Sequence, residues 1–589
     1  MKKILSNYGV LIGALCLTIV LSRMSPVLFD LFHHSADAGM LITFFAVSVL
    51  FLLSFVIHYC AVRVHFPSFV VAIFFGIAAQ PMLGSITAHD HILGIIVGAG
   101  ATLILFGGGL ETPFDNFKKL IWKILSLSFF GLFLTAVLLS CSVYFLGNLF
   151  GTHVPVVVAA LLGAILASTD PAAIIPVLRS LRFNNRQTKD LVISESAVTD
   201  VTGTLLTVAF LGILVAGGSF ISITDAYQSL FSAEVGHILF EEILYGVIFG
   251  VLGFGLLTVL TRAISNHGQE AEAHAAYFLF VPLCIFTLAA AFHGSGYLAS
   301  FIAGLLFVLS RHMHQTEHFF NYTIEGFFKP TIFILLGALV DIPELIAYAG
   351  IGIVASVLFM FVIRPISVFL TLAPFSLFGK DRFTVKELIF VSFVRETGAI
   401  PAVLLITVMS SGIPGLDGLV PIGMWVILST LIVEPPLTPF IAKWLGVAQP
   451  IKDSIELAIQ NGKTPFVVLG SRGYSFLDRL PYVTQWAVRH NIYRIVVLHC
   501  PEDKYTQEYA ASIEGQAKLA FMQVNNTRSD KGEATIDFEY ISRTGFLQDN
   551  IDALAKEDDL VTAIFVGRKV LDYRLDQVKN LKVPLFFID

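Results

Sequence analysis

The sequence predicts a polytopic α-helical membrane protein that ends in a smaller α/β domain. Of the 589 residues, 56% are hydrophobic and only 14% are charged, whereas about 25% of a soluble globular domain is charged. Long apolar runs recur up to about residue 446 and then stop. Residues 447–589 carry 17 of the 37 Lys and Arg residues and 19 of the 43 Asp and Glu residues, which is typical of a soluble domain.

The same composition excludes several other classes of protein. So apolar a chain is neither a wholly soluble enzyme, nor a disordered chain, nor a small secreted domain held by disulfides. The net charge is −6, so no basic field indicates nucleic acid as a partner. The five cysteines form no CxxC pair, which argues against a metal site or a disulfide framework.

Fourteen segments are apolar enough to cross a lipid bilayer, for which a helix needs roughly 20 apolar residues. They lie at residues 8–32, 39–60, 66–83, 91–110, 121–148, 155–178, 190–216, 240–262, 274–292, 294–311, 328–347, 349–377, 386–411 and 419–445. With the N-terminus inside, Lys and Arg residues fall in the inner loops, as basic residues prefer, and Lys329 is assigned to one of these loops. An even number of spans then places both termini in the cytoplasm.

The first apolar segment lies in residues 1–38, ahead of the main membrane domain. It begins with Met1-Lys2-Lys3, as a signal peptide would. However, its apolar stretch is long and no A-x-A-like cleavage site follows. We therefore expect an extra, retained transmembrane helix, with a cleaved signal peptide as the alternative.

The span at 155–178 contains Thr169, Asp170 and Pro171 near its middle. Ionisable groups at this depth cost at least ~2.5 kcal/mol each on insertion scales, so they are candidates for function. Proline removes a backbone donor and frees a carbonyl one turn earlier. We therefore expect a broken helix, whose free carbonyls can coordinate a cation.

The next span, 190–216, carries a second polar cluster at the same depth. Asp200 lies about eleven residues into this span, or ~16 Å along a helix, half of a ~30 Å apolar core. Spacings of four residues place the polar side chains on one face: Glu195, Ser196, Thr199 and Asp200. Two such clusters indicate a site for Na+ or K+; the alternative is a proline kink with polar packing.

Two arginines, Arg364 and Arg395, also lie deep within predicted spans. A buried arginine requires a carboxylate partner. The available carboxylates are Asp170, Glu195, Glu396 and Glu434. If one arginine neutralises Glu195, Asp200 remains able to hold either a proton or a cation but not both, which is the minimal mechanism of exchange.

Residues 39–446 resemble the monovalent cation/proton antiporter superfamily, in its bacterial Na+/H+ exchanger branch. The matching motifs are Leu105 to Glu111, Thr169-Asp170-Pro171, Glu195-Ser196 with Thr199-Asp200, Phe328-Lys329-Pro330, Arg364-Pro365, and Arg395 with Gly398-Ala399. The resemblance implies the Na+/H+ antiporter fold with thirteen helices, a core domain with two crossed broken helices, and a dimerisation domain. It also implies a homodimer that works by an elevator-like movement of the core.

The resemblance further implies a role for each polar residue of these spans. Asp200 binds the cation and the proton, surrounded by the Thr169 carbonyl, Ser196 and Asp170. Glu195 is held by an arginine, preferably Arg364.

The sequence departs from the family pattern at two positions. Thr199 replaces the Asn of electroneutral members or the second Asp of electrogenic ones, so we predict electroneutral 1:1 exchange. A neutral polar residue here also occurs in K+-linked relatives. Glu396 stands where Gly is common, and we expect it to pair with Arg395.

Together these features predict a secondary active Na+/H+ antiporter that serves pH homeostasis in a bacterial inner membrane, and not an enzyme. Its substrates are Na+ or K+ and H+, it requires no cofactor for transport, and its cytoplasmic tail regulates it. The alternatives are a K+/H+ antiporter or tail-gated K+ efflux system and, from another class, a membrane sensor without transport.

Residues 447–463 form a predicted linker to an α/β domain at 464–589. Apolar strands alternate with amphipathic stretches: Phe466–Gly470, Ile495–His499, Ile536–Ile541, Ala563–Gly567 and Val583–Ile588. The domain resembles a universal stress protein, and a Rossmann domain is the second interpretation because only G-x-x-G follows the first strand. An adenine nucleotide at Gly470, Ser471, Arg472 and Gly473 is a hypothesis; the alternative is a degenerate domain that only packs or dimerises.

Overall fold

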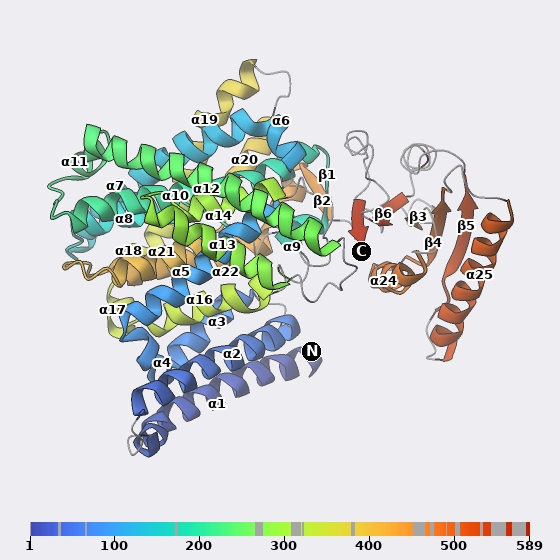
Figure 1. Cartoon of the computed structure of the whole chain (residues 1–589), viewed down its shortest axis with the longest axis horizontal. Coiled ribbons are helices and arrows are strands. Elements are labelled where there is room, and N and C mark those ends of the chain that lie inside the picture. The colour runs from blue at the N-terminus through green and yellow to red at the C-terminus, as the bar shows by residue number, and fades with distance from the viewer. Residues whose placement is uncertain are drawn as a thin grey trace. The chain divides into compact units, whose positions relative to one another are not determined.

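The chain forms two compact units, Met1–Val177 with Gln187–Thr438 and Leu178–Arg186 with Pro439–Asp589. Both are seen in a computed structural model (Figure 1). It describes residues 2–32, 37–64, 67–112, 114–170, 175–265, 275–307, 320, 323–378, 383–450, 466–471, 476–490, 492–500, 507–530, 534–543, 550, 561–567 and 585–588.

The first unit is a bundle of helices (Figure 1). Within the described ranges, eight helices are long and apolar enough to cross a membrane, or nine with a bent pair. The eight are α1 (Lys2–Phe32), α2 (Ala38–Val64), α5 (Asp90–Glu111), α6 (Phe114–Leu125) continued by α7 (Leu132–Phe150), α10 (Arg186–Val215), α12 (Ala233–Ser265), α18 (Ala349–Leu358) continued by α19 (Arg364–Phe378), and α22 (Leu419–Leu445).

The other six predicted spans contain shorter helices. The bent pair is α3 (Ser68–Ala78) and α4 (Gln80–Thr87), which meet at 89°. The rest are α8 (Val156–Leu166) with α9 (Ile175–Arg179), α13 (Ala275–Ala291), α14 (Gly296–Phe307), α16 (Lys329–Ala338) with α17 (Ile342–Ala347), and α20 (Val385–Phe393) with α21 (Ala399–Met409). Each of the fourteen predicted segments therefore contains helix.

Two of these spans are interrupted in their middle. α8 ends at Leu166 and residues 167–170 are not helical, while α20 ends at Phe393 and the helix resumes only at Ala399. These interruptions confirm the predicted pair of broken helices. Pro171, to which the first break was attributed, lies outside the described residues.

Close helix crossings hold α5 and α16, which both border the interrupted spans. A Cβ on Gly304 of α14 would lie 2.3 Å from the Phe106 carbonyl oxygen of α5. A Cβ on Gly337 of α16 would lie 2.3 Å from the Ile73 carbonyl oxygen of α3. Only glycine permits both approaches, because real Cβ atoms do not come so near a backbone oxygen.

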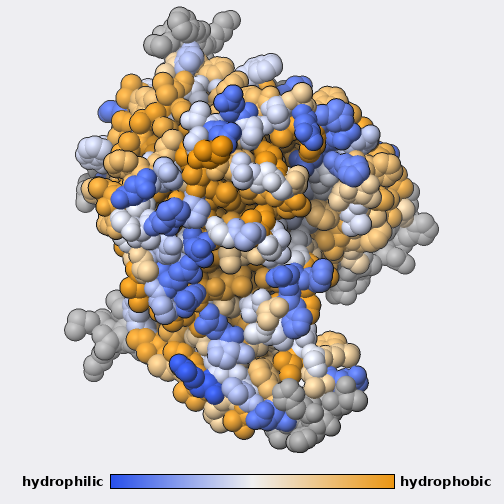
Figure 2. Space-filling view, turned by 90° about the vertical axis from the view of Figure 1, so that its left-hand side faces the viewer, coloured by the Kyte–Doolittle hydropathy of each residue, from blue (hydrophilic) through white to orange (hydrophobic). Residues whose placement is uncertain are grey.

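The surface of the first unit suits a lipid environment along its outer helices. Large apolar side chains are exposed on α1 and α12, among them Ile12, Val27, Phe240 and Val259. In water so large an exposed apolar surface would cause aggregation, whereas in a membrane lipid covers it. Figure 2 views the molecule from the side where α11 (Ile223–Ser229) and α17 lie in Figure 1, and there hydrophilic patches interrupt the hydrophobic surface.

The second unit contains a sheet of five parallel strands. Their order is β5 (Asp537–Ser542), β4 (Arg494–His499), β3 (Phe466–Ser471), β6 (Val561–Gly567) and β7 (Leu585–Ile588). All five predicted strands are present. The order reverses between β3 and β6, as in a doubly wound sheet. Apolar side chains of α24 (Phe476–Arg489) and α25 (Gln507–Asp530) cover one face, with Phe476 and Ile513 fully buried.

A short antiparallel ribbon also belongs to the second unit. β1 (Leu181–Phe183) pairs with β2 (Ala448–Pro450). Next to this ribbon, Asn184 donates its backbone N–H to the Val447 carbonyl at 3.0 Å and its side-chain amide to the Gly446 carbonyl at 2.7 Å. The ribbon therefore joins the connection between α9 and α10 to the segment that follows α22.

Candidate functional site

The candidate site lies where α10 meets the two interrupted spans. α10 is continuous over thirty residues, so its four predicted polar residues lie on adjoining turns of one helix. Their side chains are all buried, as is Asp170. The structure thus brings together the two clusters that the sequence placed at one depth.

The two interrupted spans cross at Asp170 and Glu396. The backbone N–H of Asp170 donates to the Glu396 carbonyl at 2.9 Å. The backbone N–H of Ala399, the first residue of α21, donates to Asp170 Oδ2 at 3.3 Å. A Cβ on Gly398 would lie 2.1 Å from Asp170 Cβ, so glycine is required. The negative charge of Asp170 therefore faces the positive end of α21.

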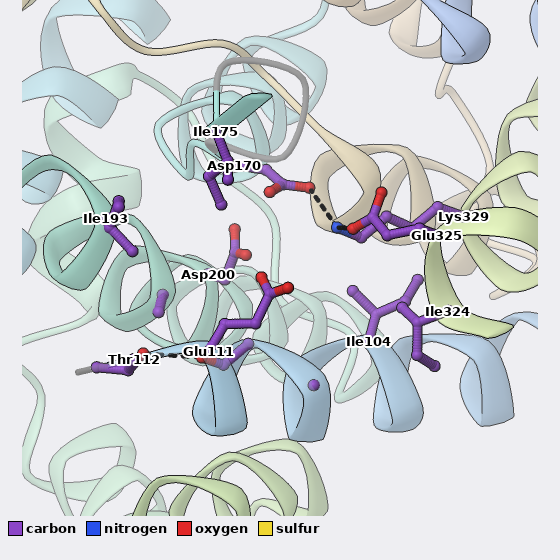
Figure 3. Close-up of a pocket in the computed structure, with 13 residues that line it drawn as sticks. Ile104, Glu111, Thr112, Asp170, Ile175, Ile193, Asp200, Ile324, Glu325 and Lys329 are labelled. Atoms are coloured by element: carbon purple, nitrogen blue, oxygen red, sulfur yellow. Dashed lines mark hydrogen bonds and ion pairs between the residues drawn. The ribbon is translucent and has the colours of Figure 1, made fainter. Parts of the chain in front are cut away.

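Asp170 and Asp200 both line one small cavity, of about 40 Å³ (Figure 3). This space suffices for a few water molecules or for a monovalent cation that has lost most of its water. Its wall consists of Ile104, Gly107, Gly108, Glu111, Thr112, Asp170, Ile175, Ile193, Ala197, Asp200, Ile324, Glu325 and Lys329. The carboxylate oxygens in this wall are suitable ligands for Na+ or K+.

Ser168 fixes the position of the Asp200 carboxylate. Its hydroxyl donates to Asp200 Oδ1 at 2.7 Å, and both residues are buried. The other oxygen of Asp200 is thereby left for the cavity. The sequence analysis did not select Ser168, although it directly precedes Thr169-Asp170 in the same unwound segment.

Thr169, Ser196 and Thr199 form a hydrogen-bonded group outside the cavity wall. The Ser196 hydroxyl donates to the Thr169 carbonyl, and the Thr199 hydroxyl donates to the Ser196 carbonyl at 2.8 Å. The Thr169 carbonyl, expected to face the cation, therefore has a hydroxyl partner in this structure. These three residues connect α10 to the unwound segment that carries Asp170.

Glu195 lies within ion-pair range of both buried arginines, Arg364 as preferred and also Arg395, which hydrogen-bonds it. Arg395 Nη1 donates to Glu195 Oε1, and its Nη2 donates to the hydroxyls of Thr169 and, at 3.1 Å, Thr199. Arg364 Nη2 lies 3.8 Å from the same Glu195 oxygen, within ion-pair range. Arg395 is nearer because the unwound segment between α20 and α21 lies directly against α10.

Glu434 of α22 adds a further buried charge beside the arginines. It is 2% exposed and interacts electrostatically with both Arg364 and Arg395. Glu396 is also buried, and its like charge opposes that of Glu434, which the two arginines compensate; its backbone forms the crossing with Asp170. The pairing of Glu396 with Arg395 remains a prediction. Buried charges are tolerated only in such paired groups.

Sequence reasoning missed three charged residues of the cavity wall: Glu111, Glu325 and Lys329. Lys329 was assigned to an inner loop, but its side chain is only 7% exposed and lies 4.0 Å from Asp170 Oδ2. The rule that basic residues mark loops fails here because Lys329 begins α16 directly beside the crossing. The available signal was its place in Phe328-Lys329-Pro330, a proline-initiated helix start.

In the second unit, Gly470 and Ser471 end strand β3, next to the point where the strand order reverses. Arg472 and Gly473 lie outside the described residues. Ser471 pairs in register with His499 at the end of β4, and His499 Nδ1 lies 2.5 Å from the Tyr540 hydroxyl. Burial lowers the pKa of the His499 imidazole. Ligands of doubly wound sheets bind at this edge.

The chain is similar to antiporters of several bacteria. It is 26% identical over 425 residues to the K(+)/H(+) antiporter NhaP of Alkalimonas amylolytica, covering 69% of this chain and 68% of that protein. It is 27% identical over 424 residues to the K(+)/H(+) antiporter NhaP2 of Shewanella oneidensis, covering 71% and 69%. It is 28% identical over 204 residues to the Na(+)/H(+) antiporter NhaP of Pseudomonas aeruginosa, covering 34% and 44%.

The fold is also that of a solved structure, the sodium proton antiporter MjNhaP1 from Methanocaldococcus jannaschii. The TM-score is 0.55 at 21% sequence identity, covering 69% of this chain and 99% of that one. The family model "Sodium/hydrogen exchanger, transmembrane" matches residues 47–444, which include the interrupted spans, α10 and both buried arginines. This chain therefore belongs to the sodium/hydrogen exchanger family of membrane transporters and is not an enzyme.

Proposed function

We propose that this protein exchanges a monovalent cation for a proton, with the two ions competing for Asp200. The observation that carries this proposal is the cavity at the crossing of the interrupted spans, into which the carboxylates of Asp170 and Asp200 both face. Two carboxylates around one small space repel each other unless a cation or a proton lies between them. A site of this kind favours the binding of one or the other.

The surrounding hydrogen bonds keep the competition at Asp200. Ser168 donates to one oxygen of Asp200 and leaves the other for the incoming ion. Glu195 is neutralised by Arg395, so it does not compete for the same ion. The resemblance adds an elevator-like movement of the core, by which the loaded cavity faces each side of the membrane in turn.

The exchange we propose is electroneutral, with one cation for one proton. Thr199 brings no charge to the site, and its hydroxyl is bonded within the group that holds Thr169. Na+ is the cation predicted from the resemblance. K+ is the second candidate, because the relatives that align over most of the chain are named K+/H+ antiporters.

Further proposals concern the assembly and the membrane. We place the protein as a homodimer in a bacterial inner membrane with both termini in the cytoplasm, where Lys and Arg residues of the alternate loops favour this orientation. A membrane sensor without transport is the alternative function. The paired carboxylates at the crossing favour transport, since a sensor has no need of an ion-exchange cavity.

The tail is a proposed regulator of transport. The ribbon of β1 and β2 supports this role, because β1 lies in the connection between the spans of Asp170 and Asp200. A ligand that moves the segment after α22 would thus pull on this connection. The proposed ligand is an adenine nucleotide at the end of β3, and titration calorimetry of the full-length protein with ATP, AMP or cyclic dinucleotides that produces no heat would refute it.

The transport proposal is tested in proteoliposomes that contain a pH-sensitive dye. Adding Na+ or K+ outside should move protons in the wild type, and Asp200→Asn should abolish this signal. Asp417→Asn, which changes an exposed aspartate, is the matched control and should retain it. Exchange that survives in Asp200→Asn would refute the site, and a rate that follows an imposed membrane voltage would refute electroneutrality.

A further inference from the structure

Lys329 supplies the only positive charge among the residues that line the cavity in the described part of the chain. Its Nζ lies 2.6 Å from Glu325 Oε1 and 4.0 Å from Asp170 Oδ2, and the side chain is 7% exposed. Figure 3 shows the ammonium between these two carboxylates. It therefore lies within reach of one of the two carboxylates that bind the transported cation.

The chain geometry gives Lys329 two alternative partners. Glu325 precedes it by four residues, across the turn where a π-helix (Ile324–Phe328) leads into α16. Residues at this spacing are neighbours on a helix. Asp170 comes from the interrupted span on the other side of the cavity. A lysine has a flexible stem of four carbons and three rotatable donors, so a small change of rotamer moves Nζ from one carboxylate to the other.

The ammonium of a lysine is chemically close to the transported ion. It carries a single positive charge on a compact head, as a monovalent cation does. Nζ bound to Asp170 would therefore satisfy that carboxylate in the same way as the cation. Because the ammonium is buried, breaking its contact with Asp170 costs free energy unless another carboxylate pairs with it. Glu325 is that second carboxylate.

We propose that Lys329 is a tethered competitor of the transported cation, paired with Asp170 when the cavity holds no cation and with Glu325 when it does. This inference rests on the proposed function of Asp170 and Asp200. Lys329 thereby sets the affinity for the cation: it lowers the affinity by occupying Asp170, and Glu325 raises the affinity by drawing Lys329 away. Lys329 and Glu325 are thus residues that position charge and tune the affinity of the site.

The test measures the KM for Na+ and K+ in proteoliposomes for a set of four variants. Lys329→Gln removes the competitor, and its KM should fall by about tenfold, the equivalent of 1.4 kcal/mol. Glu325→Gln leaves Lys329 on Asp170, and its KM should rise. The double variant should behave like Lys329→Gln alone. Lys329→Arg, which keeps the charge, should retain a KM near that of the wild type.

Lys386→Gln is the matched control, because this lysine is exposed near the start of α20, and its KM should not change. A Lys329→Gln variant with a lower maximal rate but an unchanged KM would overturn the proposal, since a purely structural role predicts that result. If Glu325→Gln raises the KM equally with and without Lys329, Glu325 attracts cations by itself and the proposal is wrong. Opposite shifts in the two single variants support it even if one of them is poorly expressed.

These results are separable from those of the main proposal. Exchange that persists in Asp200→Asn refutes the transport site, whatever the Lys329 variants do. Loss of exchange in Asp200→Asn together with an unchanged KM in Lys329→Gln and Glu325→Gln refutes only the role of the lysine.

Discussion

Two groups of buried charges lie close together in the first unit, and they differ in one respect. Asp170 and Asp200 face a cavity of about 40 Å³. Glu195 lies on the same helix as Asp200, and Arg395 directly precedes Glu396 at the crossing. These two residues nevertheless contact each other and do not line the cavity. Charges that face open space can exchange ions, whereas charges packed against each other hold helices together.

The largest expected effect separates stability from transport in these two groups. Arg395→Met leaves Glu195 without its hydrogen-bonded partner, and removing one member of a buried ion pair costs about 3–5 kcal/mol. We therefore expect a strong fall in the unfolding temperature of the purified protein in detergent. Asp200→Asn removes the carboxylate that holds the cation or the proton, so it should abolish exchange. Because the asparagine can keep the hydrogen bond to Ser168, the unfolding temperature should be unchanged or higher. An equal loss of stability in both variants would contradict the distinction.

An intermediate effect is expected at the crossing that supports both groups. Gly398→Ala places a Cβ 2.1 Å from Asp170 Cβ, and overpacking of this kind costs about 1–3 kcal/mol. Displacing Asp170 should also reduce the rate of exchange. Gly212→Ala on α10 is the control, since no atom lies within 4 Å of its added Cβ. Both variants are measured by thermal unfolding and by proton flux, and normal flux in Gly398→Ala would show that the crossing tolerates movement.

The smallest effect extends the comparison to the second unit. Burial lowers the pKa of His499, whose imidazole contacts Tyr540. The unfolded chain then binds the proton more readily than the folded one. The stability from the neutral imidazole is therefore fully present above the unfolded pKa, about 6.5, and is lost as the pH falls.

Thermal unfolding of the second unit in the full-length protein, followed between pH 7.5 and pH 5.5, measures this loss. His499→Asn should unfold at a temperature that depends less on pH over the same range. An unchanged pH dependence in this variant would assign the effect to other groups.

The sequence alone determined much of the architecture. The length of the apolar runs located all fourteen helical segments. A helix satisfies all its backbone hydrogen bonds internally, so it is one of the few structures that such a run can form in lipid. Short apolar runs that alternate with amphipathic stretches located the five strands of the second unit. Ionisable or polar residues in the middle of an apolar span cost free energy to insert, so they indicate function. This argument identified Thr169, Asp170, Glu195 and Asp200.

Tertiary structure alone decided which charges meet. Arg395 donates a hydrogen bond to Glu195 while Arg364 remains 3.8 Å away, because residues 394–398 unwind beside α10, and no periodicity in the sequence encodes that direction. The sequence predicts that Lys329 is a loop residue. In the structure, α16 lies beside the crossing, and Lys329 at its start faces Asp170. Local sequence sets helix and strand because propensity and polarity act over a few residues. The partners of buried charges depend on segments that are far apart along the chain, and only the packing of the helices brings those segments together.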